Sequence, residues 1–154
     1  MNITLKNIEH ESNNIYKALE EGKYDAHIID VQLKKTKTNR PMLEMTFELE
    51  GEKMLNGAHL GGRKERYNIL LDTKYTPSIL LNALNNLGID VKDGDEINVE
   101  QLVNCGRLMG RECQVYLLKE YYMDSLGEKK EANKIKFLSA KPVVMTINDD
   151  DIPF

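Results

Sequence analysis

The sequence predicts a mostly β domain with five strands and one main helix. Strands are indicated where apolar and polar residues alternate, most regularly from Leu43 to Glu50. A helix is indicated between residues 75 and 87, where apolar residues recur every three or four positions. A chain of 154 residues suits one domain, because it buries roughly two-thirds of its unfolded surface without a metal or a disulfide.

The first strand is predicted to begin at Gly22 and to bend along its length. Apolar residues occupy one face as far as Ile28 and the opposite face from Ile29 onward, which is typical of a β-bulge. A long bent strand can serve both halves of a small barrel. Before it, residues 1–21 are predicted to be an appendage against the domain, with a short helix capped by Ser12 that continues through Glu20.

A basic loop joins the first strand to the second. Residues 34–41 carry four cations and no acid, and Asn39 and Pro41 mark a turn. The second strand places Leu43, Met45, Phe47 and Leu49 inward. Strand, loop and strand therefore predict a hairpin, although a solvated lysine-rich tip is common without any ligand.

The third strand and the main helix follow a glycine-rich loop over residues 51–62. Residues 63–66 lead into a strand at 67–71, and a turn at 72–74 precedes the helix at 75–87. Thr76 is the expected N-cap, with Pro77 at the first helical position. Gly88 stands where a C-terminal glycine belongs.

The last two strands follow a polar stretch, residues 90–110, that contains a possible short helix at 99–104. Alternation predicts the fourth strand at 111–122. Residues 124–133 are charged and are predicted as a loop. The fifth strand is expected at 134–140, with Ile135 and Phe137 on its buried side.

Three strands, a helix and two strands is the element order of the OB-fold, a five-stranded Greek-key barrel with its helix between strands three and four. An open α+β sandwich has the same order, and the bent first strand favours the barrel. The predicted organisation is an appendage (1–21), an OB-fold domain (22–142) and a flexible acidic tail (143–154).

Charge and composition limit the classes of function. The chain has 25 acidic and 21 basic residues, and without three consecutive aspartates near its end its net charge of −4 becomes −1. A body so near neutrality binds nucleic acid only through a local basic patch. Two cysteines and three scattered histidines, with no Cys-x-x-Cys pair, argue against a zinc site, and no cofactor is expected. Lacking a signal peptide or an apolar run of membrane-spanning length, the protein is expected to be intracellular and soluble.

An OB-fold binds nucleic acid across strands two and three, between the loop joining strands one and two and the loop joining strands four and five. Three basic segments distant in sequence are therefore predicted to converge. Cations would neutralise phosphates and aromatic rings would stack on unpaired bases. The predicted DNA-binding residues are Lys34, Lys35, Lys37, Arg40, Arg63, Lys64, Arg66, Tyr67, Lys119, Tyr121, Tyr122, Lys129 and Lys130. For each tyrosine a structural place at the barrel rim is about as good an explanation, and Arg66 and Tyr67 are expected on opposite faces. Tyr24, Phe47 and Phe137 are expected to pack in the core.

The end of the chain combines charge with apolar residues. Three aspartates precede Ile152, Pro153 and Phe154, and Phe154 ends the sequence. Like charges and proline disfavour regular structure, whereas the apolar pair suits a partner with a hydrophobic pocket rimmed by cations. The segment Asp149, Asp150, Asp151, Ile152, Pro153, Phe154 resembles the terminal peptide of bacterial single-stranded-DNA-binding proteins. The resemblance implies recruitment of replication, repair and recombination proteins.

A second resemblance covers the beginning of the domain. The run from Gly22 to Phe47, with its loop at 34–40, is similar to the opening of bacteriophage OB-fold single-stranded-DNA-binding proteins. Asn39-Arg40 replaces the glycine expected after Thr38. This family implies binding without sequence preference, in replication or recombination of phage DNA, with no catalysis. A phage-encoded protein of this kind would act in the cytoplasm of the host cell.

Two other functions are compatible with the sequence. An OB-fold adaptor would bind only proteins, and the near-neutral body keeps this alternative open. A nuclease would need carboxylates that converge on a rigid pocket, whereas Asp93, Asp95 and Glu96 read as a solvated turn. We therefore expect a protein that is not an enzyme. The sequence does not decide whether it forms a homodimer.

Overall fold

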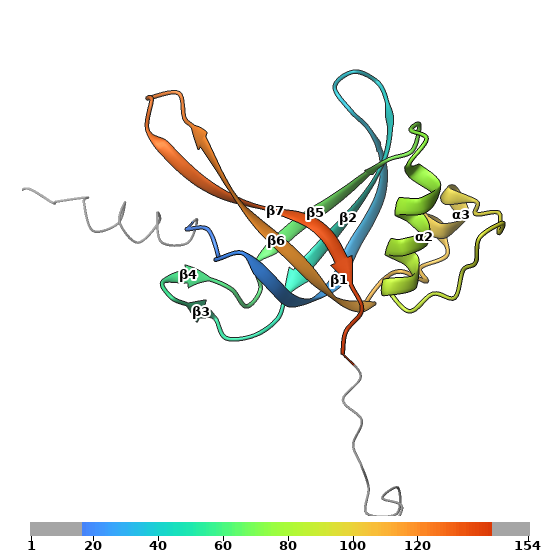
Figure 1. Cartoon of the computed structure of the whole chain (residues 1–154), viewed down its shortest axis with the longest axis horizontal. Coiled ribbons are helices and arrows are strands. Elements are labelled where there is room, and N and C mark those ends of the chain that lie inside the picture. Colours follow the sequence, from blue (N-terminus) through green and yellow to red (C-terminus); the bar gives the residue numbers. More distant parts are fainter. Residues whose placement is uncertain (1–16, 143–154) are drawn as a thin grey trace, which may run out of the picture.

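The computed structural model describes residues 17–142 as a five-stranded antiparallel sheet, a two-stranded ribbon and two helices (Figure 1). The strand order in the sheet is β5-β2-β1-β6-β7. The predicted mostly β architecture is confirmed. Ser12 and the acidic tail lie outside the described residues. Lys17–Glu20 are described and are not helical, so the predicted helix does not extend to Glu20.

Strand β1 (Gly22–Lys35) connects the two halves of the sheet. Its beginning pairs with β6, and its longer remainder pairs with β2 (Pro41–Leu49). The predicted bulge is confirmed, because the register with β2 shifts between Ile28 and Asp30. At the hairpin turn, Asn39 adopts a φ of 64°, the left-handed conformation that asparagine tolerates better than most residues. Asparagine thus takes the place where glycine was expected.

The third strand, β5 (Lys64–Leu70), pairs with β2 along most of its length. The glycine-rich segment before it is not only a loop, since it contains the ribbon formed by β3 (Met54–Leu55) and β4 (Ala58–His59). This ribbon was not predicted, because strands of two residues are too short to show an alternation of apolar and polar residues.

The helices α2 (Thr76–Asn86) and α3 (Val99–Asn104) lie at one end of the sheet, at the right of Figure 1. The predicted N-cap is wrong: Tyr75 is the cap residue, and Thr76 lies within the helix. The Thr76 hydroxyl donates a 2.6 Å hydrogen bond to the Leu70 carbonyl oxygen, so it ties the helix to the end of β5. Gly88 has a φ of 83°, as expected for a glycine after a helix.

Strands β6 (Glu112–Met123) and β7 (Lys129–Ser139) form a long hairpin. The fifth strand therefore begins at Lys129, five residues before the predicted Lys134. The prediction for Phe137 is also wrong, because this side chain is 39% exposed and Leu138 is buried instead. The cause is a register shift: Tyr116 faces Phe137, Leu117 faces Ile135, and Lys136 is the extra residue of a bulge.

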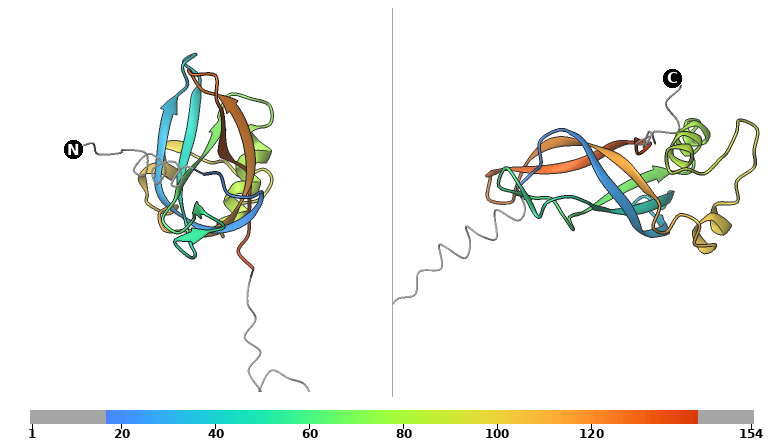
Figure 2. Two further views of the ribbon diagram at one scale, coloured as in Figure 1. Left: turned by 90° about the vertical axis from the view of Figure 1, so that its left-hand side faces the viewer. Right: turned by 90° about the horizontal axis from the view of Figure 1, so that it is seen from below.

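The curled sheet encloses the core, as the two views of Figure 2 show. Phe47 and Met45 of β2 are fully buried there, with Leu84 of α2 beside them in the same cluster. Before β1, Leu19 is also buried, and the Asn133 side chain bonds both its amide nitrogen and its carbonyl oxygen. Cα atoms of the edge strands β5 and β7 come within 8 Å, without a hydrogen-bonded ladder between them in the described residues.

Cys113 is buried in β6 and Cys105 is exposed. Burial, followed by the negative charge of Glu50, raises the pKa of the Cys113 thiol to about 12. Among residues 17–142, no helix has both the length and the apolar character required to traverse a membrane.

Candidate nucleic-acid interface

Two long hairpins project to the same side of the molecule. In Figure 1 the β1–β2 tip stands at the upper right and the β6–β7 tip at the upper left, with β5 and β2 running between their bases. In the first view of Figure 2 both tips again point upward. The loops predicted to flank a bound strand therefore stand on either side of the predicted binding strands.

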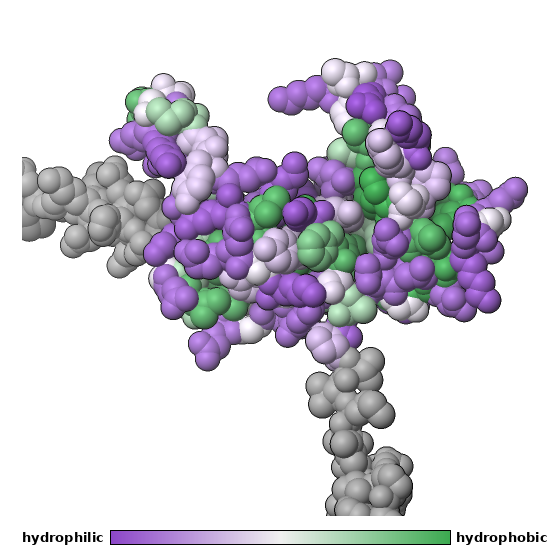
Figure 3. Space-filling view, viewed as in Figure 1, coloured by the Kyte–Doolittle hydropathy of each residue, from purple (hydrophilic) through white to green (hydrophobic). Residues whose placement is uncertain are grey.

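The β1–β2 tip exposes Lys35 and Lys37, and its end is hydrophilic in Figure 3. Arg40, at the base of this hairpin, forms an ion pair with Asp72. Its Nε and Nη2 atoms donate to the two carboxylate oxygens of Asp72 at 3.1 and 2.9 Å. This ion pair lowers the pKa of the Asp72 carboxyl, through the hydrogen bond first. Arg40 thus anchors the hairpin to the turn before α2.

Glu44 lies at the centre of the outer face of β2, and its residue is only 7% exposed. The Lys34 Nζ is 3.0 Å from its carboxylate, and the Arg66 Nε approaches the same oxygen at 3.9 Å. Three adjacent strands contribute to this cluster, which brings together two of the predicted basic segments. A carboxylate between these cations also competes with any phosphate for them.

Strand β5 places alternate residues on opposite faces. Lys64 and Arg66 are exposed on the outer face, whereas Arg63 and Tyr67 lie on the inner one. The expected opposition of Arg66 and Tyr67 is confirmed. Tyr67 packs against the core, and burial raises the pKa of its hydroxyl. Tyr67 therefore packs within the domain, which is the structural alternative that the sequence offered for each tyrosine.

Arg63 is also engaged inside the domain, with a side chain that is 13% exposed. Its Nε donates to Glu65 at 2.9 Å and its Nη1 donates to the Lys17 carbonyl oxygen at 2.8 Å. Burial raises the pKa of Glu65 despite the neighbouring guanidinium, which acts in the opposite direction. The donors of Arg63 hold the segment before β1, so this arginine belongs to the fold rather than to the exposed surface.

A hollow of about 460 Å³ links β5 to the second hairpin. Lys64 lines it from β5, and Tyr122 lines it from β6. Glu131 and Asn133 of β7 complete its opposite wall. The outer face of β5 therefore leads directly to an exposed ring of the β6–β7 hairpin.

The β6–β7 hairpin carries two exposed tyrosines on opposite faces. The Lys129 ammonium lies 4.2 Å from the centre of the Tyr121 ring, in a cation–π contact. Tyr122, half exposed, lies on the other face and lines the hollow. The two rings therefore cannot both stack on the bases of a DNA strand that is bound at one face of the hairpin. The hairpin tip also has an apolar surface (green in Figure 3), where Met123 and Leu126 are exposed.

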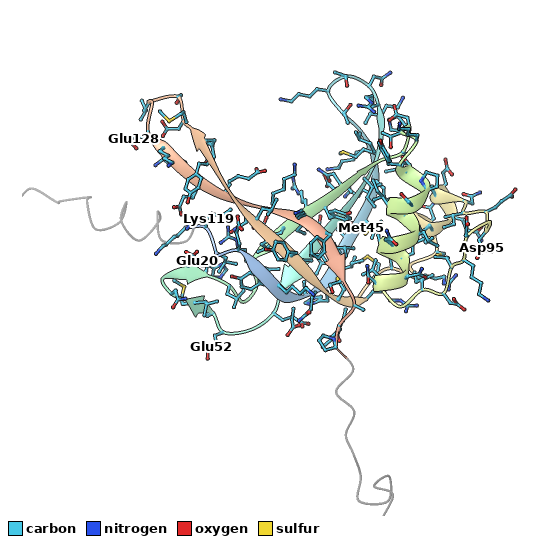
Figure 4. All side chains as sticks on the ribbon, in the orientation of Figure 1. Glu20, Met45, Glu52, Asp95, Lys119 and Glu128 are labelled. Atoms are coloured by element: carbon cyan, nitrogen blue, oxygen red, sulfur yellow. The ribbon has the colours of Figure 1, made fainter. Side chains whose placement is uncertain are left out.

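Two predicted lysines of this hairpin are bound by acids. Lys119 lies near Glu20, away from Glu128 at the tip (Figure 4), and its Nζ is 3.1 Å from the Glu20 carboxylate and 3.6 Å from that of Glu131. Lys130 lies 3.4 Å from the Glu128 carboxylate and 4.0 Å from that of Asp124. Lys119 is largely shielded, whereas Lys130 remains partly exposed.

Nine of the thirteen predicted DNA-binding residues fall into two groups. Lys34, Lys64, Arg66 and Tyr122 follow one surface between the hairpins, with Lys35 and Lys37 on the adjoining tip. Arg63, Tyr67 and Lys119 are held within the domain. The six tail residues from Asp149 to Phe154 lie outside the described part of the chain.

Sequence reasoning missed Glu44 and the stacked rings of Tyr116 and Phe137. Glu44 looked like any outward residue of an alternating strand. The two rings could have been found only by recognising the bulge at Lys136. Within residues 17–142, no group of three or more histidine, cysteine, aspartate or glutamate side chains is arranged to hold a metal.

Comparison with known proteins gives one family. A family model described as "Protein of unknown function (DUF669)" matches residues 3–139. No curated protein matches the chain. The matched region includes all the strands and helices described above.

Proposed function

The chain belongs to the family described as "Protein of unknown function (DUF669)", and for this member we propose sequence-independent binding of single-stranded DNA by an OB-fold. The proposed role is in phage DNA replication or recombination, without catalysis, in the cytoplasm of the host cell. Partners would be recruited through the C-terminal segment from Asp149 to Phe154, because this segment resembles the terminal peptide of bacterial single-stranded-DNA-binding proteins.

The sheet supports the OB-fold part of this proposal. Strands β1, β2 and β5 precede α2, and strands β6 and β7 follow it. In an OB-fold the third and fifth strands approach to close a barrel that stays partly open. Here those strands are β5 and β7, whose Cα atoms come within 8 Å. Relative to the five strands and one helix of an OB-fold, the β3–β4 ribbon and α3 are additional elements.

One observation carries the DNA-binding part. Cations from β1 and β5, which are far apart in sequence, meet around Glu44, and the same face continues through Lys64 to the exposed ring of Tyr122. Single-stranded DNA needs such a row, because cations neutralise successive phosphates while rings stack on bases. A duplex keeps its bases paired and offers no free base face to the tyrosines.

An adaptor that binds only proteins is the alternative, and Glu44 favours it. A buried carboxylate beside Lys34 and Arg66 already neutralises part of the basic row. The apolar tip formed by Met123 and Leu126 is a surface that a protein could cover.

A fluorescence anisotropy titration separates these functions. The protein is titrated into labelled oligo-dT and into duplex DNA of equal length, at low and moderate salt. We expect binding to oligo-dT that weakens with salt and exceeds duplex binding. The double variant Lys35→Ala/Lys37→Ala should weaken binding and reduce the salt slope by about 0.7 for each phosphate that the protein no longer neutralises.

The matched control is Lys53→Ala/Lys92→Ala, which removes the same charge. Lys53 follows Glu52 and Lys92 precedes Asp95, and both acids lie away from the hairpin tips in Figure 4. Absence of oligo-dT binding at either salt would reject DNA binding in favour of the adaptor. An equal effect of both double variants would place the DNA elsewhere.

A further inference from the structure

A pair of stacked rings lies on the outer face of β6 and β7, away from the hairpin tip. The ring centres of Tyr116 and Phe137 are 4.9 Å apart, with an angle of 15° between the planes. Neither ring belongs to the buried core, and Phe137 is 39% exposed. Phe137 sits on the edge strand β7, so one face of its ring is next to Tyr116 and the other is turned away from it.

Lysines surround this pair. In the register of the sheet, Lys23 of β1 lies opposite Tyr116, and Tyr116 lies opposite Phe137. The adjacent position pairs Leu118 with Lys134, and Lys136 is the extra residue of the bulge between the two rows. All three lysines are exposed.

The three lysines have no ion-pair partner among the described residues. Two acids lie two positions from Lys23 in the chain: Asp25 accepts a hydrogen bond from the neutral amide of Gln114 and keeps its charge, and the exposed Glu21 accepts one from the Lys119 backbone. Glu112 pairs with Lys141, and Glu120 is exposed farther along β6. The surface formed by Tyr116, Phe137, Lys23, Lys134 and Lys136, here called the ring surface, therefore combines an apolar centre with three exposed lysines.

We propose that the ring surface is a second contact site for single-stranded nucleic acid, a proposal that rests on the proposed function. Aromatic faces stack on unpaired bases, and lysines beside them contact the phosphates. A stacked cross-strand pair also stabilises a sheet. That role alone does not call for three unpaired lysines around it, whereas a polyanion with apolar bases matches both features.

The ring surface continues the interface between the hairpins. Tyr116, Leu118, Glu120 and Tyr122 are alternate residues of β6 and so share its outer face. Tyr122 lies six positions after Tyr116 along the strand, a span of roughly 20 Å. A strand that leaves the hollow at Tyr122 could thus follow β6 to the stacked rings, and the site would exceed the length held between the hairpins.

Oligonucleotide length provides the test. Wild type, Phe137→Leu and Lys134→Ala/Lys136→Ala are titrated with oligo-dT of about 6 and about 20 nucleotides, one length near the lower end of the roughly 4–16 nucleotides bound by one OB-fold and one above that range. Leucine keeps the apolar volume but removes the aromatic face. We expect each variant to bind the long oligonucleotide about fivefold or more weakly, and to bind the short one as wild type does.

The controls separate the two proposals. Thermal melting establishes that each variant is folded, and Lys53→Ala/Lys92→Ala should bind both lengths normally. If the two ring-surface variants bind both lengths like wild type, the second contact is refuted while the proposed function stands. An equal loss at both lengths would refute a separate surface. If wild-type protein binds neither length, the proposed function fails, and this proposal fails with it.

Discussion

Glu44 shows how a single acid can limit the affinity of a basic surface. Its carboxylate lies 3.0 Å from Lys34 and 3.9 Å from Arg66, and its side chain is 8% exposed. A phosphate that binds there must compete with a partner already in place. The arrangement holds both cations in position and lowers their net attraction for DNA.

We predict that Glu44→Gln tightens binding of oligo-dT by about threefold or more and steepens its salt dependence, because two cations become available. The amide keeps the shape of the side chain. Glu52→Gln is the matched control, since Glu52 is exposed, lies away from the hairpin tips in Figure 4 and forms no ion pair with another described residue. Weaker binding by Glu44→Gln, or an equal gain in both variants, would contradict this role.

For single strands and helices, the spacing of apolar residues was enough to predict the elements that depend only on their own sequence. Alternation located β2, the change of face at Ile28 located the bulge of β1, and helical spacing located α2. The start of β7 was missed because the hairpin arm is solvated on both faces, so Lys129–Asn133 show no apolar alternation. Phe137 was misplaced because one extra residue, Lys136, reverses the faces beyond it.

The two phenylalanines should differ in their effect on stability. Phe47 is fully buried, so Phe47→Ala should lower the free energy of unfolding by about 3–5 kcal/mol. Phe137→Ala removes a half-exposed ring and its stacking on Tyr116, with a smaller loss, about 1–2 kcal/mol. Urea unfolding monitored by circular dichroism measures both. Equal losses would mean that Phe137 is buried, as simple alternation implied.

The Arg40–Asp72 pair makes the β1–β2 hairpin sensitive to acid. Because the pKa of Asp72 is lowered in the folded protein, the pair contributes stability that is present above its ordinary value of 3.8 and is lost as the pH falls through the folded pKa. We predict that NMR titration finds the Asp72 pKa below 3.8, and that Arg40→Ala returns it toward this value.

Arg40→Lys is the informative companion. It keeps a cation for phosphate but cannot reproduce the two parallel hydrogen bonds to Asp72. If Arg40 acts by anchoring the hairpin, the lysine variant should weaken oligo-dT binding nearly as much as the alanine variant. Binding restored to the wild-type level by lysine would instead indicate a direct phosphate contact.

At the scale of the whole molecule, the sequence predicted which segments are basic but not which cations are already paired. Lys119 with Glu20, and Arg63 with the Lys17 carbonyl oxygen, join segments far apart in the chain. Such pairs depend on how the sheet curls, which no local pattern reports. The candidate interface is therefore smaller than the set of predicted cations and is centred on Lys34, Lys64, Arg66 and Tyr122.

The acidic C-terminal segment is expected to serve partners rather than DNA. Deleting Asp149–Phe154 removes three carboxylates that compete with phosphates for the basic surface. Binding of oligo-dT should be unchanged or tighter, and co-purification of replication or recombination proteins from the host should be lost. Weaker DNA binding by the truncated protein would assign the segment to the DNA site instead.

We propose that both hairpins and the outer face of β5 contact one strand of DNA. Amide chemical-shift mapping of the ¹⁵N-labelled protein during addition of oligo-dT tests this most directly. We expect the largest shifts to occur together, with a single affinity, at Lys34–Arg40, at Lys64–Asn68 and at Tyr121–Lys130. Shifts confined to one of these segments, or concentrated around α2 and α3, would contradict it.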